Sequence, residues 1–395
     1  MRFPEFTGEW KEMELNQCCD RLEYGMNAAA TEYDGVNKYI RITDIDENTS
    51  QYSQNDIVSP LGILEDKYLV KANDILFART GASTGKTYHY QESDGKLYFA
   101  GFLIRAKISY RYNSKFIFYQ TQTYQYKKWI GIMSARSGQP GINSQEYGTL
   151  PIVITSNEEQ DKIARFLSLI DERIATQNKI IEEYKKLKDT LVEKMFAYTN
   201  KKPELRFAEY DYDWSKHTYA DIFKIARNRN ADNNTLKVLS ASQQDGMIER
   251  DQIEVDIKYN KDNIKSYKIV EVGDYIVHLR SFQGGFAYAN INGICSPAYT
   301  ILRSRNNNLS HSFLKDFFIS KKFINTLRLV TYGIRDGKSI NVEEFLNLEV
   351  RIPTSAEQNR IVNTITSMES KLKFEIELLI LLNKQKQYLL TKMFI

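Results

Sequence analysis

Cysteine and histidine are scarce in this chain of 395 residues, which contains three cysteines and four histidines. The cysteines are Cys18, Cys19 and Cys295. Their number and spacing exclude a disulfide framework or a cysteine-rich zinc site. The histidines are His89, His217, His278 and His311. They lie far apart in the sequence and lack the spacing of metal ligands. We therefore expect a reduced cytoplasmic protein without a metal site.

Long apolar runs are also missing. No segment approaches the length of about 18 apolar residues that indicates a membrane span. The opening MRFPEFTGEW does not have the pattern of a signal peptide. The composition, with 42% hydrophobic and 12% aromatic residues, is typical of a folded protein with substantial cores. The length predicts two or three domains, and no membrane partner is expected.

A recognisable catalytic constellation is absent too. There is no Ser/His/Asp arrangement, no nuclease-like cluster of acids with lysine, and no Asn-Pro-Pro-type signature of adenine methylation. GASTGKT (81–87) looks like a phosphate-binding loop, but Gly81 and Gly85 enclose only three residues, fewer than the Walker pattern requires. The following TYHYQESDG predicts strand and turn instead of helix. We expect recognition without catalysis, and no cofactor in this chain.

What the chain does contain is a long stretch that occurs twice. One copy begins SNEEQDKIARFLSLIDER at Ser156, and the other begins TSAEQNRIVNTITSMESK at Thr354. Glu159 corresponds to Glu357 and Met195 to Met393, a constant separation of 198 positions. Each copy opens with the pattern of a capping box, Ser156 with Glu159 and Thr354 with Glu357, which predicts a helix start.

Within each copy, apolar residues recur in alternating steps of four and three, which is typical of a coiled-coil seam. The seam residues of the first copy are Ile163, Leu167, Ile170, Ile174, Ile181 and Leu191. Those of the second copy are Ile361, Ile365, Met368, Leu372, Leu379 and Leu389. Polar residues interrupt both seams at the same two places, Gln177/Glu375 and Lys188/Lys386. Because polar seam residues fix register, we expect the two helices to pair with each other.

The direction of pairing follows from connectivity. A short linker through Pro203 joins the end of the first helix to the next block, so that block must begin near this helix end. The block then leads into the second helix. We therefore predict an antiparallel coiled coil with a globular block at each end, a pseudo-twofold dumbbell.

The two globular blocks repeat each other as well. RFPEFTGEW in the first block returns as RFAEYDYDW from Arg206, and Asp74 corresponds to Asp274. Segments 39–46, 68–81, 96–109, 267–285 and 293–305 read as strands, and segments 116–130 and 313–327 read as helices. The fold class is thus α+β. The predicted domains are residues 1–155, the helix 156–202, residues 203–353 and the helix 354–395.

Positive charge is concentrated in one part of each block. Residues 75–156 contain 10 Lys/Arg and 3 Asp/Glu, and residues 275–342 contain 9 and 2, so each stretch has a local charge of +7. A single stretch of this kind could be a solvated face. Its recurrence in both blocks favours contact with a polyanion such as DNA.

Candidate DNA-binding residues lie in the loops and helices of these basic stretches. The Gly-rich loop after a predicted strand supplies Arg79, Thr80, Ser83 and Lys86, and its second-half counterpart supplies Arg280, Ser281 and Gln283. The lysines expected to contact phosphates are Lys127, Lys128, Lys321 and Lys322. The candidates for base edges are Arg136, Ser137, Gln139, Asn143, Arg335, Lys338 and Asn341, since Arg suits guanine and Asn or Gln suits adenine. The aromatic residues Phe116, Phe118, Phe313 and Phe317 are expected in the core.

The whole chain resembles the specificity subunit of type I restriction-modification systems. The resemblance rests on RFPEFTGEW, on DILFARTGASTGK, on the paired EQ…KMF helices and on the order of domain, helix, domain, helix. It implies two target recognition domains that read the halves of a bipartite, asymmetric site in double-stranded DNA. It also implies helices that act as a spacer and dock two methyltransferase subunits, with restriction subunits joining for cleavage. S-adenosylmethionine, ATP and Mg would then belong to the partner subunits.

Two alternatives remain from the residues alone. A coiled-coil adaptor could bind protein partners through its end domains, although the two basic stretches argue against this reading. An enzyme that uses the GASTGKT loop is the other alternative.

Overall fold

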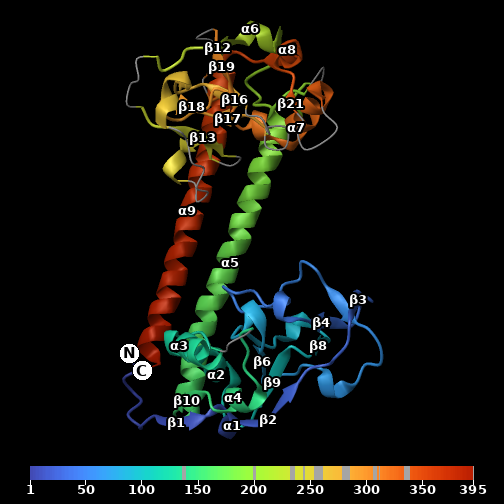
Figure 1. Ribbon diagram of the computed structural model, residues 1–395, viewed down its shortest axis with the longest axis vertical. Coiled ribbons are helices and arrows are strands. Elements are labelled where there is room, and N and C mark those ends of the chain that lie inside the picture. Colours follow the sequence, from blue (N-terminus) through green and yellow to red (C-terminus); the bar gives the residue numbers. More distant parts are fainter. Residues whose placement is uncertain are drawn as a thin grey trace. The chain divides into compact units, whose positions relative to one another are not determined.

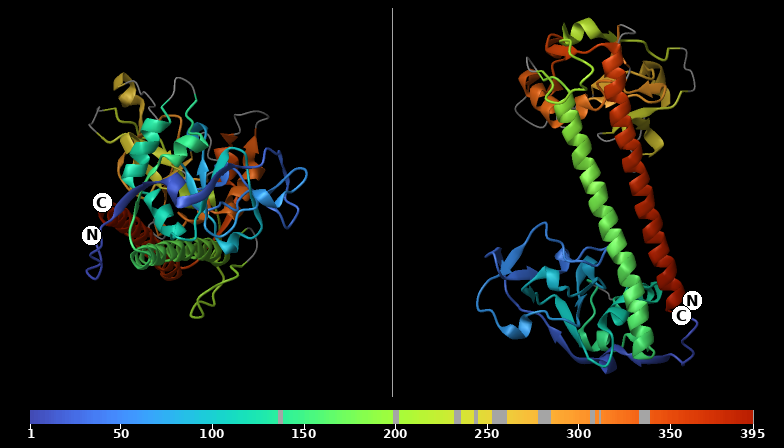
Figure 2. Two further views of the ribbon diagram at one scale, coloured as in Figure 1. Left: turned by 90° about the horizontal axis from the view of Figure 1, so that it is seen from below. Right: turned by 180° about the vertical axis from the view of Figure 1, so that it is seen from behind.

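The computed structural model describes the chain from residue 1 to 394, except residues 136–138, 199–201, 232–235, 243–244, 253–260, 278–284, 306–308, 311 and 333–338. The chain forms two compact units (Figures 1 and 2). Unit 1 consists of Met1–Asn178 and Glu377–Ile395, and unit 2 consists of Lys179–Ile376. Each unit is therefore built from segments of both long helices.

The sheet of unit 1 is antiparallel and has the strand order β2-β9-β6-β7 among the described residues. Smaller pairings are β1 with β10, β3 with β5, and β4 with β8, of which the last is parallel. The strands of unit 1 are β1 Lys11–Glu14, β2 Cys19–Tyr24, β3 Ala30–Glu32, β4 Lys38–Ile40, β5 Val58–Pro60, β6 Asp74–Ala78, β7 Thr87–His89, β8 Leu97–Phe99, β9 Leu103–Ile108 and β10 Pro151–Ile154. Its short helices are α1 Leu15–Cys18, η1 Ile42–Asp44, η2 Asp66–Tyr68, η3 Gly81–Ser83, η4 Glu92–Asp94, α2 Ser114–Gln120, α3 Tyr124–Met133 and α4 Ser144–Gly148.

Unit 2 repeats this plan. Within its described part, the strand order β12-β19-β16-β17 matches β2-β9-β6-β7, and β11 with β22 matches β1 with β10. Its strands are β11 Ser215–Thr218, β12 Phe223–Ala226, β13 Leu239–Ser242, β14 Gly246–Glu249, β15 Lys268–Val270, β16 Tyr275–Val277, β17 Ala287–Tyr288, β18 Gly293–Cys295, β19 Thr300–Ser304, β20 Thr331–Tyr332, β21 Ser339–Ile340 and β22 Glu349–Ile352. Its short helices are α6 Tyr219–Ile222, η5 Arg250–Gln252, η6 Lys261–Ser266, η7 Phe317–Ile319, α7 Lys321–Leu327, η8 Arg328–Val330 and α8 Val342–Leu346.

Helices α5 (Asn157–Met195) and α9 (Ser355–Met393) have 39 residues each and pack together in both units. In unit 1, Ile163 and Leu167 near the start of α5 share a core with Leu389 and Met393 near the end of α9. In unit 2, Val192 near the end of α5 shares a core with residues near the start of α9, including Ile361 and Ile365. The two helices therefore run antiparallel within each unit, and the α+β fold class is confirmed.

The predicted seam residues are buried to different degrees. The structure buries Ile163, Leu167, Ile174, Ile181, Ile361, Ile365 and Leu389. It leaves Ile170, Leu191, Met368, Leu372 and Leu379 partly buried. The two lysines that interrupt the seams each form an ion pair with the facing helix. Lys386 Nζ lies 2.7 Å from Asp171 of α5, and Lys188 Nζ lies 2.7 Å from Glu369 of α9. These equivalent pairs give the polar interruptions a role in register.

Several predicted elements are shorter than the sequence indicated. The strand expected at 39–46 ends at Ile40, because Asp44 accepts hydrogen bonds from the backbone N and the guanidinium of Arg41 and closes a turn. The strand expected at 68–81 is confined to β6. The strand expected at 267–285 divides into β15 and β16, and residues 278–284 of this segment lie outside the described residues. The strands expected at 96–109 and 293–305 are each interrupted by a turn.

The helices also differ from the prediction. The helix expected at 116–130 is interrupted after Gln120, where Thr121 donates a hydrogen bond to Phe118 O and Thr123 caps the start of α3. The helix expected at 313–327 is divided into η7 and α7, and Ser320 caps α7. The side chains of Phe116, Phe118, Phe313 and Phe317 are buried, so the prediction that they lie in the core is confirmed.

Candidate nucleic-acid interface

Two loops of unit 1 that carry predicted DNA-binding residues lie side by side. The loop after β6 (residues 79–86) and the segment before α4 (residues 139–143) are joined through their backbones. The N–H of Gly81 donates to Pro140 O at 2.9 Å, and the N–H of Ile142 donates to Arg79 O at 2.9 Å. Residues that are far apart in the sequence therefore form one local surface.

Arg79 occupies the edge of this surface. Its guanidinium carbon lies 4.9 Å from the centroid of the Tyr24 ring, in a cation–π contact. Within the described part of the chain, the guanidinium forms no ion pair or hydrogen bond. Its N–H groups are therefore available to an external acceptor.

Gln139 lies next to the same loop. Gly81 has φ +68°, and a Cβ built at this glycine would lie 3.1 Å from Nε2 of Gln139. A side chain at position 81 would therefore be strained and would displace the glutamine amide. As for Arg79, the described residues offer the Gln139 amide no hydrogen-bond partner. Arg79 and Gln139, the two candidates for base contacts in these loops, thus both have side-chain hydrogen-bond donors without a partner among the described residues.

Two aromatic residues that the sequence did not single out border Arg79. Tyr24, the last residue of β2, is 41% exposed, and Phe102, in the turn between β8 and β9, is 60% exposed. The N–H of Arg79 donates to Phe102 O at 3.1 Å. The signal in the sequence was a glycine beside each of them, at Gly25 and Gly101, because glycine marks turns where two backbones approach closely.

The lysines of this region differ in their availability. Lys127 and Lys128 are exposed on α3, which contacts the loop through a hydrogen bond from Tyr126 Oη to Gly85 O of 2.9 Å. Lys86 lies in the loop itself, and its Nζ donates to Ile45 O at 3.3 Å. Thr80 and Ser83 are half-buried in the same loop. The loop and α3 are therefore in contact, and together they carry three lysines: Lys86, Lys127 and Lys128.

Asn143 and Asn341 have a structural role. Oδ1 of Asn143 accepts from the N–H of Glu146 and caps α4, and Oδ1 of Asn341 accepts from the N–H groups of Glu343 and Glu344 and caps α8. Their Oδ1 atoms therefore already accept hydrogen bonds within the protein, and base contacts by these two residues stay a prediction. The Asn-x-x-Glu pattern at both places was a signal for a helix cap.

In unit 2, Lys322, which is expected to contact phosphate, has partners within the protein. Its Nζ donates to Glu193 O at 3.1 Å, lies 3.5 Å from Glu204 and lies over the ring of Tyr198. Lys321 is exposed beside it. Seven other candidates lie outside the described residues: Arg136, Ser137, Arg280, Ser281, Gln283, Arg335 and Lys338.

Asp74 and its counterpart Asp274 each form an ion pair with an arginine of the neighbouring strand. Arg105 of β9 lies 3.6 Å from Asp74, and Arg303 of β19 lies 2.8 Å from Asp274. Arg105 also binds Glu23. Burial raises the pKa of Asp74 to about 6, although a backbone hydrogen bond from Lys71 and the charge of Arg105 act in the opposite direction. These pairs connect neighbouring strands of each sheet.

Comparison with known proteins finds relatives of this chain. The model of the type I restriction modification DNA specificity domain matches residues 7–186. A protein of Methanocaldococcus jannaschii assigned as the type I restriction enzyme MjaX specificity subunit is 24% identical over 204 residues. The matched residues are 49% of this chain and 47% of that protein, so the match spans about half the length of this relative.

The fold of the whole chain is similar to solved structures. One is the type I restriction-modification S subunit from M. genitalium, with a TM-score of 0.57, 17% identity and coverage of 98% of this chain and 96% of that one. Another comes from a study of complex assembly and conformational transition of the type I R-M system, with a TM-score of 0.59, 15% identity and 96% coverage of both chains. The resemblance to specificity subunits that the sequence indicated is confirmed.

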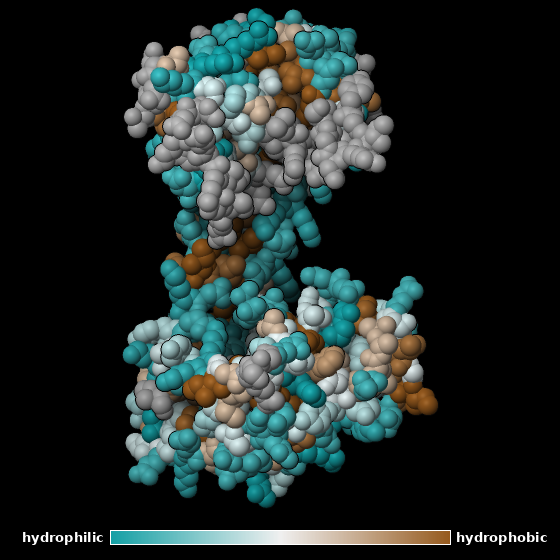
Figure 3. All heavy atoms as spheres, in the orientation of Figure 1, coloured by the Kyte–Doolittle hydropathy of each residue, from teal (hydrophilic) through white to brown (hydrophobic). Residues whose placement is uncertain are grey.

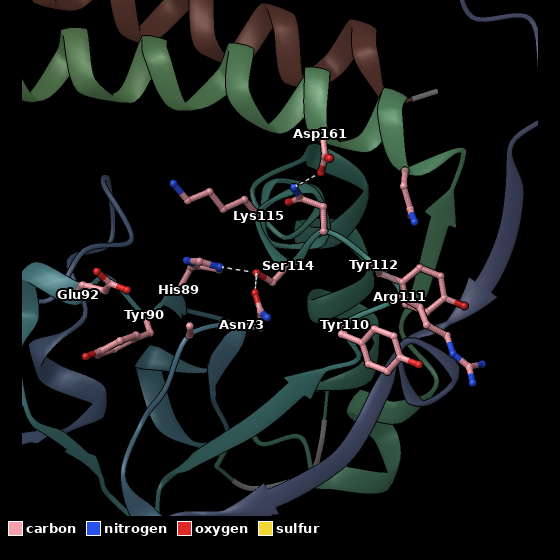
Figure 4. Close-up of a pocket in the computed structure, with 13 residues that line it drawn as sticks. Asn73, His89, Tyr90, Glu92, Tyr110, Arg111, Tyr112, Ser114, Lys115 and Asp161 are labelled. Atoms are coloured by element: carbon pink, nitrogen blue, oxygen red, sulfur yellow. Dashed lines mark hydrogen bonds between the residues drawn. The ribbon is translucent and has the colours of Figure 1, made fainter.

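Unit 1 also contains a pocket of about 440 Å³ away from the two loops (Figure 4). At its floor, Nε2 of His89 lies 2.9 Å from Ser114 Oγ, which donates to Asn73 Oδ1 at 3.0 Å. Burial, together with the charge of Lys115, lowers the pKa of His89 to about 4, so its ring is neutral at neutral pH. Figure 4 shows Lys115 and Arg111 pointing in opposite directions, which does not favour an anion site.

Neither a metal site nor a membrane span is found in the described part of the chain. No group of three or more His, Cys, Asp or Glu side chains there is placed to hold a metal ion. None of the described helices has the apolar length that crossing a membrane demands.

Proposed function

We propose that this chain is the recognition subunit of a type I restriction-modification complex, and that its two units read the two halves of a bipartite, asymmetric site in double-stranded DNA. The observation that carries the proposal is the duplicated fold with unlike side chains at equivalent positions. The loop after Arg79 in unit 1 has the sequence TGASTGK, whereas the corresponding stretch after Arg280 in unit 2 has the sequence SFQGG. Equal frameworks with different surfaces suit two different half-sites.

In unit 1, phosphate contacts and base contacts would come from neighbouring elements. Lys127, Lys128 and Lys86, with the hydroxyl groups of Thr80 and Ser83, would position the domain on the DNA backbone. Arg79 and Gln139 would contact base edges in the major groove. In unit 2, Lys321 and the candidates outside the described residues, such as Arg280 and Arg335, would have the corresponding roles.

The long helices would dock the partner subunits. On the exposed side of α9, Ile380 is 49% exposed and Leu381 is 61% exposed, and Figure 3 shows a hydrophobic patch along this helix. Exposed apolar patches of this kind often mark protein interfaces. We propose that a methyltransferase subunit binds this patch. We also propose that the length of the helices determines the number of base pairs between the two half-sites. S-adenosylmethionine, ATP and Mg would be bound by the methyltransferase and restriction subunits, and this chain would contribute no catalytic group.

DNA binding of the complex at increasing salt concentration tests this proposal. The chain is purified with its methyltransferase subunit, and fluorescence anisotropy follows binding to a duplex library. Because phosphate contacts release counterions, affinity should fall steeply with salt while a preferred sequence class persists. A folded complex with no affinity for DNA would refute the proposal and would favour a coiled-coil adaptor that binds proteins.

A further inference from the structure

Tyr24 contacts Arg79 of one loop and Ser144 at the end of the other, and these two loops carry the free donors of Arg79 and Gln139. We propose that Tyr24 is a positioning residue for sequence recognition, which orients Arg79 through its ring and the 139–144 segment through its hydroxyl. Arg79 and Gln139 then read neighbouring base pairs of the first half-site, a guanine by Arg79 and an adenine by Gln139. This inference rests on the function proposed above.

The ring contact determines the orientation of Arg79. A guanidinium carbon at 4.9 Å from the ring centroid of Tyr24 places the cation over the face of the ring. Stacking uses the flat face of a guanidinium and leaves its in-plane N–H groups free. Two parallel N–H groups match the O6 and N7 acceptors of guanine, which is the commonest specific contact in the major groove. Holding the side chain in this orientation before binding reduces the entropy lost on binding.

The hydroxyl contact fixes the second loop. The N–H and Oγ of Ser144 both donate to Tyr24 Oη, each at 3.1 Å. Partial burial raises the pKa of Tyr24, but the hydrogen bonds from Ser144 and the charge of Arg79 lower it further than burial raises it. Ser144 opens α4, and Gln139 precedes it in the segment that is joined to Gly81 and Arg79 by backbone hydrogen bonds. One side chain thus touches both loops.

The backbone holds Tyr24 in place. Gly25 follows it directly, and a Cβ built at this glycine would lie 2.2 Å from Ala100 O. The N–H of Gly25 donates to Leu103 O at 3.2 Å, and Tyr24 pairs with Ile104 of β9. The end of β2 is therefore fixed against β9, and the tyrosine ring projects from a rigid strand. A site on a strand is held more exactly in place than one on a loop.

The fold itself does not require tyrosine at this position. Tyr24 is 41% exposed, so it contributes little to the core. We attribute the tyrosine to recognition by unit 1, and Tyr24→Ile is a substitution that the framework should accept.

The test uses the complete complex with its methyltransferase subunit. The methylated motif of the wild-type complex is determined first, and methylation rates are then measured on duplexes with single base-pair changes in each half-site. The variants are Tyr24→Ile, Tyr24→Phe, Arg79→Ala and the double variant Tyr24→Ile/Arg79→Ala. Circular dichroism and the thermal unfolding midpoint check that each variant is folded.

Tyr24→Ile should relax discrimination at one or two neighbouring base pairs of a single half-site, by about tenfold or more at the guanine. Arg79→Ala should weaken discrimination at the same guanine. The double variant should discriminate at this position as well as Arg79→Ala does. Tyr24→Phe should retain discrimination at the guanine and lose it at the neighbouring pair. Discrimination at the other half-site should be unchanged.

Two results would overturn the inference while the proposed function stands. In one, Tyr24→Ile leaves discrimination at every position unchanged. In the other, it slows methylation of all duplexes equally, which is what a structural role would do. A wild-type complex that methylates no sequence motif would instead refute the proposed function, and the role of Tyr24 with it.

Discussion

Arg2 forms a bidentate ion pair with Glu159, whose side chain is completely buried. The Nε and Nη2 of Arg2 donate to the two carboxylate oxygens, each at 2.7 Å. In unit 2, Arg206 and Glu357 form the same pair at 2.7 and 2.8 Å. The arginines come from RFPEFTGEW and RFAEYDYDW, and the glutamates come from the EQ pair that opens each long helix. In each unit, the opening motif and the EQ pair of the long helix are therefore joined by the same ion pair.

Other contacts repeat in the same way. In unit 1, Lys162 of α5 binds Glu5 and lies 4.5 Å from the ring centroid of Phe3. In unit 2, Arg360 of α9 lies 3.9 Å from Glu209 and 5.2 Å from the ring centroid of Phe207. Each opening motif thus fastens the first turns of a long helix to its own unit.

We predict that Arg2→Met destabilises the start of α5. The substitution leaves the Glu159 carboxylate buried without its partner, which costs much more than removing an exposed ion pair. Hydrogen exchange of the amides of residues 160–167 should become faster, and the matched variant Arg206→Met should affect residues 358–365 instead. The double variant Arg2→Met/Glu159→Gln should recover part of the protection. Unchanged exchange in Arg2→Met would contradict the role of this pair.

Phe394, near the end of the chain, belongs to the core of unit 1. Its ring lies 5.2 Å from that of Phe116 and 6.3 Å from that of Trp10. Phe196, its equivalent in the first long helix region, lies 5.0 Å from Phe313 in unit 2. The end of each helix repeat therefore completes the unit that contains the start of the other.

We predict that Phe394→Ala lowers the apparent free energy of unfolding of unit 1 by about 3 kcal/mol, with a change in the fluorescence of Trp10. Phe196→Ala is the matched control and should instead change the fluorescence of Trp214. Urea titration of each variant, in backgrounds where the other tryptophans are replaced by phenylalanine, measures both effects. A response of Trp214 to Phe394→Ala would be inconsistent with this assignment.

Acid should weaken unit 1 through His89. The pKa of His89 falls from 6.5 to about 4 on folding because the ring is buried and Lys115 is nearby. The neutral ring therefore contributes stability above pH 6.5, and this contribution is lost as the pH falls toward 4, to a total of about 3 kcal/mol. Asp74, whose pKa is raised to about 6, has the opposite effect in the same range.

The variant His89→Gln separates the two contributions, because glutamine does not titrate while the response of Asp74 is retained. Urea titrations at several pH values should show that the difference between wild type and variant changes between pH 6.5 and 4. A difference that is independent of pH would contradict burial of a neutral His89.

Docking of the methyltransferase should depend on the exposed patch of α9. Leu381→Glu places a charge in the centre of a proposed apolar interface, and should weaken binding of the methyltransferase subunit about tenfold or more. Gln387→Glu adds the same charge at another exposed position of the helix and should have little effect. Isothermal titration calorimetry with the isolated subunits measures both. Equal affinities for the wild type and Leu381→Glu would place the docking surface elsewhere.

Much of the fold could be predicted because the apolar residues of the long helices are periodic and the sequence repeats. The seam of the long helices, their antiparallel direction and the duplication follow from spacing and from a short linker, and the structure agrees in each unit. Element boundaries were less predictable, because single side chains decide them. Asp44 and Thr123 end or start elements through local hydrogen bonds that compete with the periodic pattern.

The candidate site was predicted only in part. The sequence indicated Arg79 and Gln139, but their proximity depends on pairing between loops that are far apart in the chain. Glu159 was predicted as half of a capping box with Ser156. Its N–H does donate a hydrogen bond to Ser156 Oγ, at 3.4 Å, but its carboxylate binds Arg2 instead of the helix start. Long-range partners of this kind leave no periodic signal in a single sequence.

The most direct test of the central claim is single-molecule methylation sequencing of DNA from a methylation-deficient host. The host expresses this chain with its methyltransferase subunit, and a control host expresses the methyltransferase subunit alone. The proposed function predicts a bipartite motif with two unlike halves that is methylated only when this chain is present. If the folded complex methylates no new motif, or methylates the same motif without this chain, the claim that this chain supplies the sequence specificity is contradicted.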